Sequence, residues 1–208
     1  MSIYQRFGQG PFPPSAKQMN LKNIDSYFAA AVTMDAEIKW VDATLNLTEK
    51  LKGTSEYSEE YLTARLAKLK TEPVAMGLVD SPVIPLKQRL NSTNAALQKQ
   101  LPVVMDKVTG KDPDEHRKMS ALDDERKLLE DEWIAFYRAR FPLLVEVLPK
   151  IFYLILDGCD MTTVQSCFTQ LKKVMAGEIT SKNATSNLMN ESTERYNLPA
   201  GFWEVKKE

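Results

Sequence analysis

The residues that could carry out chemistry are few in this chain. It holds one histidine, His116, and two cysteines, Cys159 and Cys167. A serine or cysteine nucleophile needs a base beside it, and His116 is the only imidazole that could serve. The cysteines stand eight residues apart, which fits neither a CxxC redox motif nor a zinc knuckle, so we expect free thiols. The sequence has no Walker loop and no GxGxxG, GxSxG or HExxH motif.

One cluster of possible metal ligands precedes and includes the histidine, in the run Asp-Pro-Asp-Glu-His at 112–116. Helix capping explains the same residues more simply. Asp112 suits the N-cap and Pro113 the first helical position. Asp114 and Glu115 then lie at the positive end of the helix dipole. We therefore expect a helix start here, with no metal site, no cofactor and no enzymatic activity.

Composition and charge narrow the classes of partner. The chain has 208 residues, with 27 Lys and Arg against 28 Asp and Glu and a formal net charge of -1. This balance argues against a nucleic-acid-binding protein that works through a broadly basic surface. Hydrophobic residues make up 43%, enough for a sizeable core. No secretory signal pattern precedes the helical part, so we expect the cytosol or the inside of an intracellular particle, and not secretion.

The elements that must position these residues are predicted to be helices. Apolar residues recur at spacings of three and four along the first of them, the pattern of a helix packed lengthwise on a partner. These positions are Ile24, Tyr27, Ala31, Met34, Ile38, Val41 and Leu45. Gly53 is expected to end this helix in the left-handed conformation. Thr54, Ser55 or Ser58 can then cap a shorter helix.

Two further helices follow an apolar, proline-rich connector at 73–85, which we expect to pack over other helices. The first of the two begins at Pro85 and is kinked or split at Pro102. The second begins at Pro113, and arginines stand at two of its apolar seam positions, Arg126 and Arg140. Each arginine either extends its stem from the seam to solvent or forms an inter-subunit ion pair that fixes register.

Local ion pairing is also available to Arg126, because Asp123 and Glu130 lie within one turn of it. The stretch 141–156 is the most hydrophobic of the chain and is predicted to form a central buried helix. It is too short for a membrane span and carries two prolines and two charges, Glu146 and Lys150. Gly158 ends it.

The chain thus divides into four segments. Residues 1–20 form an irregular arm, 21–158 a helical bundle, 159–196 a helical hairpin, and 197–208 a second irregular arm. The arms contain aromatic residues but too many Pro and Gly residues for helix, and such side chains usually pack on another surface. The candidate partner-binding residues are Tyr4, Phe7, Phe12, Phe202 and Trp203.

The sequence predicts an all-α fold, an elongated bundle of about six helices with proline kinks. Our first functional hypothesis is a non-enzymatic structural or assembly protein, such as a component of a viral or other large particle. Its arms and helical seams would dock onto other proteins, with self-association as the expected mode. The alternative is a peripheral membrane module, a helical bundle or BAR-like dimer, although no basic cluster supports it. A small helical enzyme is a third hypothesis.

Overall fold

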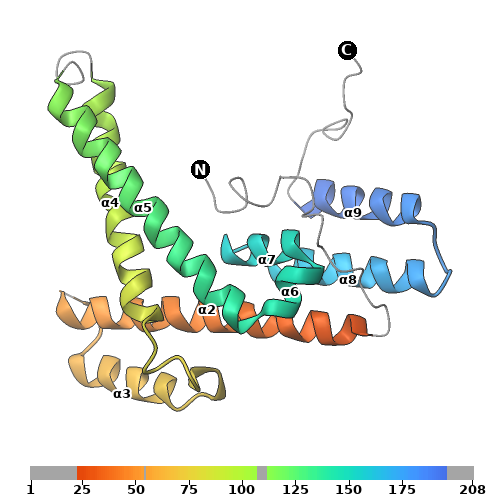
Figure 1. Cartoon of the computed structure of the whole chain (residues 1–208). Coiled ribbons are helices and arrows are strands. Elements are labelled where there is room, and N and C mark those ends of the chain that lie inside the picture. Colours follow the sequence, from red (N-terminus) through yellow and green to blue (C-terminus); the bar gives the residue numbers. More distant parts are fainter. Residues whose placement is uncertain (1–22, 54, 107–111, 196–208) are drawn as a thin grey trace. The chain divides into compact units, whose positions relative to one another are not determined.

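The computed structural model describes residues 23–53, 55–106 and 112–195, and most of these are helical (Figure 1). They form eight α-helices and one 3₁₀ turn and contain no β-strand, which confirms the all-α prediction. The elements are α2 (Ile24–Lys52), α3 (Glu59–Lys70), η2 (Pro73–Ala75), α4 (Val83–Met105), α5 (Pro113–Arg140), α6 (Pro142–Val147), α7 (Pro149–Leu156), α8 (Met161–Met175) and α9 (Ser181–Arg195). Both predicted arms, with Tyr4, Phe7, Phe12, Phe202 and Trp203, lie outside the described residues.

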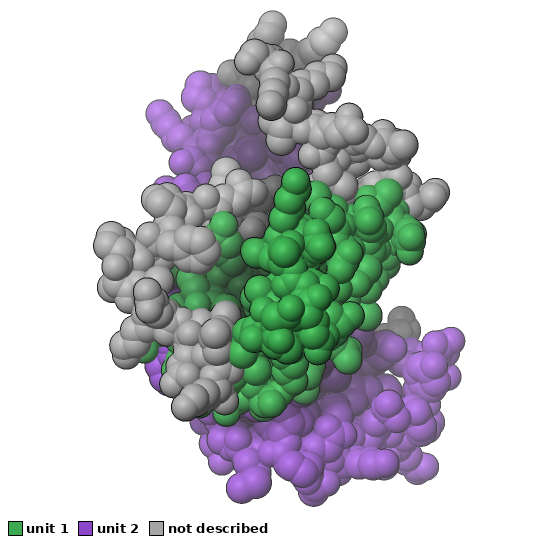
Figure 2. Space-filling model, turned by 90° about the vertical axis from the view of Figure 1, so that its right-hand side faces the viewer, with its two compact units in different colours: residues 1–32, 143–208 green, residues 33–142 purple. Residues whose placement is uncertain are grey.

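The helices group into two compact units, drawn in two colours in Figure 2. Unit 1 comprises residues 1–32 and 143–208, and unit 2 comprises residues 33–142. The four segments predicted from the sequence follow the order of elements along the chain, whereas the units follow contacts in space. The segment boundaries remain predictions.

Helix α2 confirms the clearest sequence pattern. All seven predicted seam residues are buried, and three of them, Ala31, Met34 and Val41, have no exposed surface. Because these positions repeat every three to four residues, they form one apolar stripe along the helix. The structure adds buried polar residues beside this stripe, among them Glu37 and Thr44.

Helix α3 belongs to unit 2 and begins at the predicted cap. The Ser58 hydroxyl accepts a hydrogen bond from the Tyr61 N–H, 3.3 Å away. The indole Nε1 of the buried Trp40 donates to the Leu69 carbonyl oxygen at 2.9 Å. This bond joins the end of α3 to the middle of α2, so α3 runs back along the unit 2 part of α2 (Figure 1).

The predicted cap at Gly53 is wrong in its geometry. Helix α2 does end at Lys52, but the φ of Gly53 lies outside the left-handed region. Left-handed glycines occur instead at Gly77, Gly158 and Gly177. Gly158 and Gly177 follow α7 and α8, where a positive φ turns the chain out of the helix.

The connector between α3 and α4 packs as predicted, since Ala75 and Leu78 are buried. Helix α4 begins at Val83, two residues before the predicted start at Pro85, because proline is tolerated in the first turn of a helix. Pro102 lies inside α4, which continues to Met105.

Helices α4 and α5 form an antiparallel pair within unit 2 (Figure 1). The Gln100 side chain donates to the Glu115 carboxylate at 2.6 Å, and Arg89 Nη2 lies 3.7 Å from the Glu125 carboxylate. Residue numbers rise along α4 as they fall along α5, which fixes the antiparallel direction. Helix α5 starts as predicted, with the Asp112 carboxylate accepting from the Asp114 N–H at 2.9 Å.

The prediction of one helix over 141–156 is wrong. The stretch forms α6 and α7, separated by Leu148 at φ -131° and ψ 55°. Proline has no N–H to donate and its ring clashes with the carbonyl one turn earlier, so Pro142 and Pro149 each begin a new helix. These breaks raise the helix number above the predicted six. Burial is concentrated in α7, where Phe152 and Ile155 are almost fully enclosed.

The predicted C-terminal hairpin is present as α8 and α9, which pack together in unit 1. The Asp160 carboxylate caps α8 by accepting from the Thr162 N–H at 2.9 Å, and the Thr180 hydroxyl accepts from the Asn183 N–H at 3.2 Å. The Phe28 and Phe168 rings lie 5.2 Å apart and join α8 to the first turns of α2 within unit 1.

None of the helices that the structure describes combines the length and the apolar character needed to cross a bilayer.

Candidate protein interaction site

The two seam arginines of α5 are both ion-paired within the chain. Arg126 donates from Nη2 to the Asp123 carboxylate at 2.7 Å and from Nη1 to the Glu130 carboxylate at 2.5 Å. The predicted local pairing is therefore confirmed. The Arg126 side chain is 13% exposed, so its guanidinium stays near the seam rather than extending fully to solvent.

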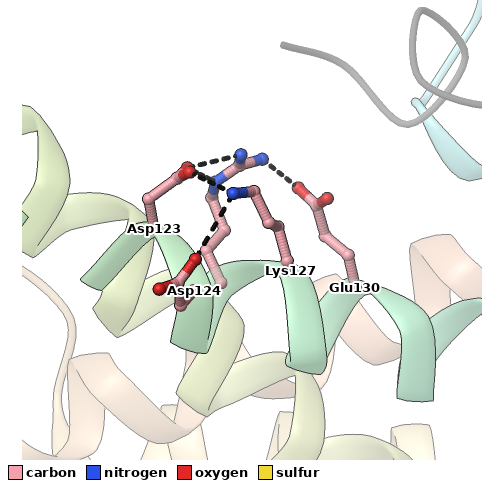
Figure 3. A network of polar contacts seen from close by, with 5 residues as sticks. Asp123, Asp124, Lys127 and Glu130 are labelled. Carbon is pink, nitrogen blue, oxygen red and sulfur yellow. Dashed lines mark hydrogen bonds and ion pairs between the residues drawn. The ribbon is translucent and has the colours of Figure 1, made fainter. Parts of the chain in front are cut away.

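The pairs around Arg126 join into one network on a single face of α5 (Figure 3). Lys127 Nζ lies 2.7 Å from the Asp123 carboxylate and 3.4 Å from that of Asp124. Hydrogen bonds from Lys127 and Arg126 lower the pKa of Asp123 to about 2. The network supports the helix locally.

Arg140 forms a two-pronged pair with Glu37 of α2. Its Nε lies 2.9 Å from Oε2 and its Nη2 lies 2.6 Å from Oε1. The Glu37 side chain is 6% exposed and that of Arg140 30% exposed. Glu37 was not predicted, because it stands beside the seam residue Ile38 and its partner is 103 residues away. The pair joins α2 to the end of α5 inside unit 2.

Polar atoms without partners lie in the same unit. Among the described residues, Trp133 Nε1, Tyr137 Oη and Thr44 Oγ1 are buried without a hydrogen-bond partner. Burial, and then the Glu37 carboxylate, raise the pKa of Tyr137, so its hydroxyl stays neutral. In native proteins most buried polar groups have a hydrogen-bond partner, supplied by the protein or by an ordered water.

The outer part of the α4–α5 pair is poorly enclosed. We call residues 94–106 and 112–122 the hairpin tip. No residue of the hairpin tip is buried, and Leu101 and Met105 are 46% and 76% exposed. Leu97, Val104 and Met119 are only half-buried. Two helices alone enclose one seam between them, so apolar side chains beside that seam stay in contact with water.

A second exposed apolar surface lies where α2 meets α3. The rings of Tyr57 and Tyr61 stack at 5.4 Å with 26° between their planes, and they are 45% and 49% exposed. Lys50 Nζ lies 5.4 Å from the centre of the Tyr57 ring. We call Tyr57 and Tyr61 the tyrosine stack.

A pocket of about 180 Å³ adjoins this stack. It is lined by Lys50, Leu51, Gly53, Ser55, Tyr57, Glu59 and Leu62. The lining combines one aromatic ring, a cation, a carboxylate and a hydroxyl at the protein surface, a mixture typical of polar-rimmed interaction sites.

Neither Cys159 nor Cys167 forms a disulfide in the structure, as predicted. Burial, and then the charge of Glu191, raise the pKa of Cys167, which makes it a poor nucleophile at neutral pH. Within the described ranges, no group of three or more His, Cys, Asp or Glu side chains could hold a metal ion.

No family model, curated protein or solved structure matches this chain. The candidate site is therefore argued from the structure alone. Its features are the hairpin tip, the tyrosine stack and the two arginine pairs, all of which lie in unit 2.

The tyrosine stack was not predicted, although the sequence holds a signal for it. Tyr57 and Tyr61 are four residues apart and flank the Ser58 cap, so the first turn of α3 brings their rings to one face. Neither residue belongs to a long apolar seam, so the helical repeat gives no reason to single them out.

Proposed function

We propose that this protein is a non-enzymatic structural or assembly protein that docks onto other copies or other proteins. It would serve as a component of a larger particle, viral or otherwise. The docking elements are the helical seams of unit 2 and the aromatic-bearing segments 1–20 and 197–208.

The hairpin tip is the observation that carries this proposal. It holds apolar side chains that the described residues leave in contact with water, Leu101 and Met105 above all. Burying a leucine or methionine side chain is worth about 1.5–3 kcal/mol. A protein partner packed along both helices would enclose these side chains as the other half of a four-helix bundle does.

The segments 1–20 and 197–208 support the same proposal from the sequence. Their aromatic residues, Tyr4, Phe7, Phe12, Phe202 and Trp203, offer large apolar area among Pro and Gly residues. Aromatic residues of this kind are enriched among the anchors of protein interfaces.

A pair of charge insertions tests the proposal. In the variant Leu101→Lys/Met105→Lys, we expect the solution mass at high concentration to fall, because lysine at the interface opposes burial. The matched control is Leu128→Lys on α5, where the leucine is 65% exposed but lies outside the hairpin tip.

Far-UV circular dichroism checks that both variants keep their helicity. A normal mass for the hairpin-tip variant, with removal of segments 1–20 and 197–208 also without effect, would contradict the proposal.

A further inference from the structure

Ser120 lies on α5 within the hairpin tip, and two cations precede it. The sequence reads Arg-Lys-Met-Ser at 117–120. Protein kinases select their substrates partly by charge, and the basophilic serine/threonine kinases prefer cations two and three residues before the acceptor hydroxyl. Ser120 is the only serine or threonine of the whole sequence with Lys or Arg at both of these positions. The sequence therefore singles out its hydroxyl as an acceptor for such a kinase.

The structure leaves this serine and its two cations accessible. Ser120 is exposed, and its hydroxyl makes no hydrogen bond with the part of the chain that the structure describes. The side chains of Arg117 and Lys118 are 80% and 62% exposed. The hydroxyl of Ser92, which also follows an arginine by three residues, instead donates to a backbone carbonyl oxygen one turn earlier, 3.0 Å away. Ser120 thus offers a free hydroxyl beside two exposed cations.

The first turns of α5 are held weakly enough to open. A kinase binds its substrate in an extended conformation, so the helix must unwind around Ser120. None of the residues of α5 before Leu129 is buried. The ion pairs of Arg117 and Lys118 with acids of the first turn lie at the surface, where such pairs contribute little to stability. Segments with few buried contacts open locally at a lower free-energy cost than the core does, so residues 114–124 can reach an extended conformation without global unfolding.

We propose that Ser120 is a phosphorylation site for a basophilic serine/threonine kinase and that the phosphate blocks the packing of partners on the hairpin tip. The γ-phosphoryl group of Mg-ATP passes to the Ser120 oxygen. The new P–O bond forms as the bond to ADP breaks, and the hydroxyl proton passes to the catalytic aspartate of the kinase. The second half of this inference rests on the proposed function, whereas the first half does not.

The phosphate would change the charge of the hairpin tip strongly. It adds a charge of about -1.5 to -2 and three hydrogen-bond acceptors. Asp123 and Asp124 follow Ser120 by three and four residues, so on the helix the phosphate adjoins two carboxylates. Met119, next to Ser120, is only half-buried. A partner that packs over this apolar side chain would have to desolvate the phosphate as well, which opposes packing.

Phosphorylation of the folded, full-length chain tests the first half. The probe is the catalytic subunit of cyclic-AMP-dependent protein kinase with Mg-ATP, and mass spectrometry locates the phosphate. We expect Ser120 to be modified, and Arg117→Ala/Lys118→Ala to slow its modification at least about tenfold, because the two cations supply the recognition. The matched control is Arg65→Ala/Lys68→Ala, which removes two exposed cations of α3 and should leave the rate unchanged.

A synthetic peptide of residues 114–124 separates recognition from access. It contains the same acceptor and the same cations without the fold. We expect the kinase to modify both the peptide and the full chain at Ser120. Modification of the peptide but not of the chain, of neither, or of Ser92 in preference to Ser120 would overturn the inference.

Light scattering of the phosphorylated full-length chain tests the second half. We expect it to associate at least about tenfold more weakly than the unmodified chain, and Ser120→Ala treated with the same kinase to associate normally. Normal association of the phosphorylated chain would refute the blocking role and leave the proposed function standing. An unmodified chain that associates neither with itself nor with a partner would contradict the proposed function and the blocking role, while the phosphorylation result would stand on its own.

Discussion

Arg140, the last residue of α5, donates two hydrogen bonds of 2.9 and 2.6 Å to the Glu37 carboxylate of α2. Only arginine offers a planar fork that matches a carboxylate in this way. The Arg140 guanidinium also lies 5.7 Å from the centre of the Phe136 ring. The pair links the C-terminal end of α5 to α2 within unit 2.

Loss of Arg140 should destabilise the protein. Arg140→Ala leaves the 6% exposed Glu37 carboxylate without its partner, and we expect the free energy of unfolding to fall by about 3 kcal/mol. The free energy of unfolding of Arg140→Lys should lie between those of the unmodified chain and Arg140→Ala, because lysine keeps the charge but lacks the planar fork. Chemical denaturation of each variant measures the change.

A double-mutant cycle isolates the pair. Glu37→Ala leaves a 30% exposed arginine that water can solvate, so it should cost less than Arg140→Ala. The double variant should cost clearly less than the sum of the two single changes. Additive costs would mean that the two residues stabilise the fold independently.

Acid should weaken the network on α5. The pKa of Asp123 is about 2, held there first by the hydrogen bond from Lys127 and then by Arg126. An unfolded aspartate has a pKa of about 3.9, so this contribution to stability is complete above that pH and is lost as the pH falls toward about 2.

In Asp123→Asn, the free energy of unfolding should therefore fall less steeply with decreasing pH between about pH 4 and pH 2. Its dependence on pH near neutrality should be unchanged. Denaturant titrations at a series of pH values measure both slopes. Asp80→Asn serves as the control, because Asp80 is an exposed aspartate of the connector. The same acid sensitivity in the Asp123 variant and in the unmodified chain would argue against the network.

The glycine after α7 should resist substitution. Gly158 has φ +75°, and a Cβ there would meet no atom within 4 Å, so the cost of alanine is conformational. We expect Gly158→Ala to lower the melting temperature and to cost about 1–2 kcal/mol. Gly53→Ala is the matched control, since Gly53 lies outside the left-handed region and should tolerate alanine or gain slightly.

The parts of the fold that follow local rules could be predicted from the sequence. The seam of α2, the Ser58, Asp112 and Asp160 caps and the pairing of Arg126 all depend on residues within about one turn of one another or on a simple repeat. Pro149 also signals a helix break, but the continuous apolar run around it favours a single helix.

The long-range parts could not be predicted in this way. Glu37 and Arg140 are 103 residues apart, and no pattern in either helix names the other. The exposure of Leu101 and Met105 depends on how few elements cover the hairpin tip, which a one-dimensional pattern does not encode. The tyrosine stack needs the turn between α2 and α3 before its rings become one surface.

We propose that copies of this chain, or the chain and a partner protein, assemble through unit 2. The most direct measurement is the solution mass of the full chain by light scattering after size exclusion, over a wide range of concentrations. We expect a defined oligomer or a mass that rises with concentration, reduced by Leu101→Lys/Met105→Lys. A monomer at every concentration, with no partner bound through the hairpin tip, would contradict the account.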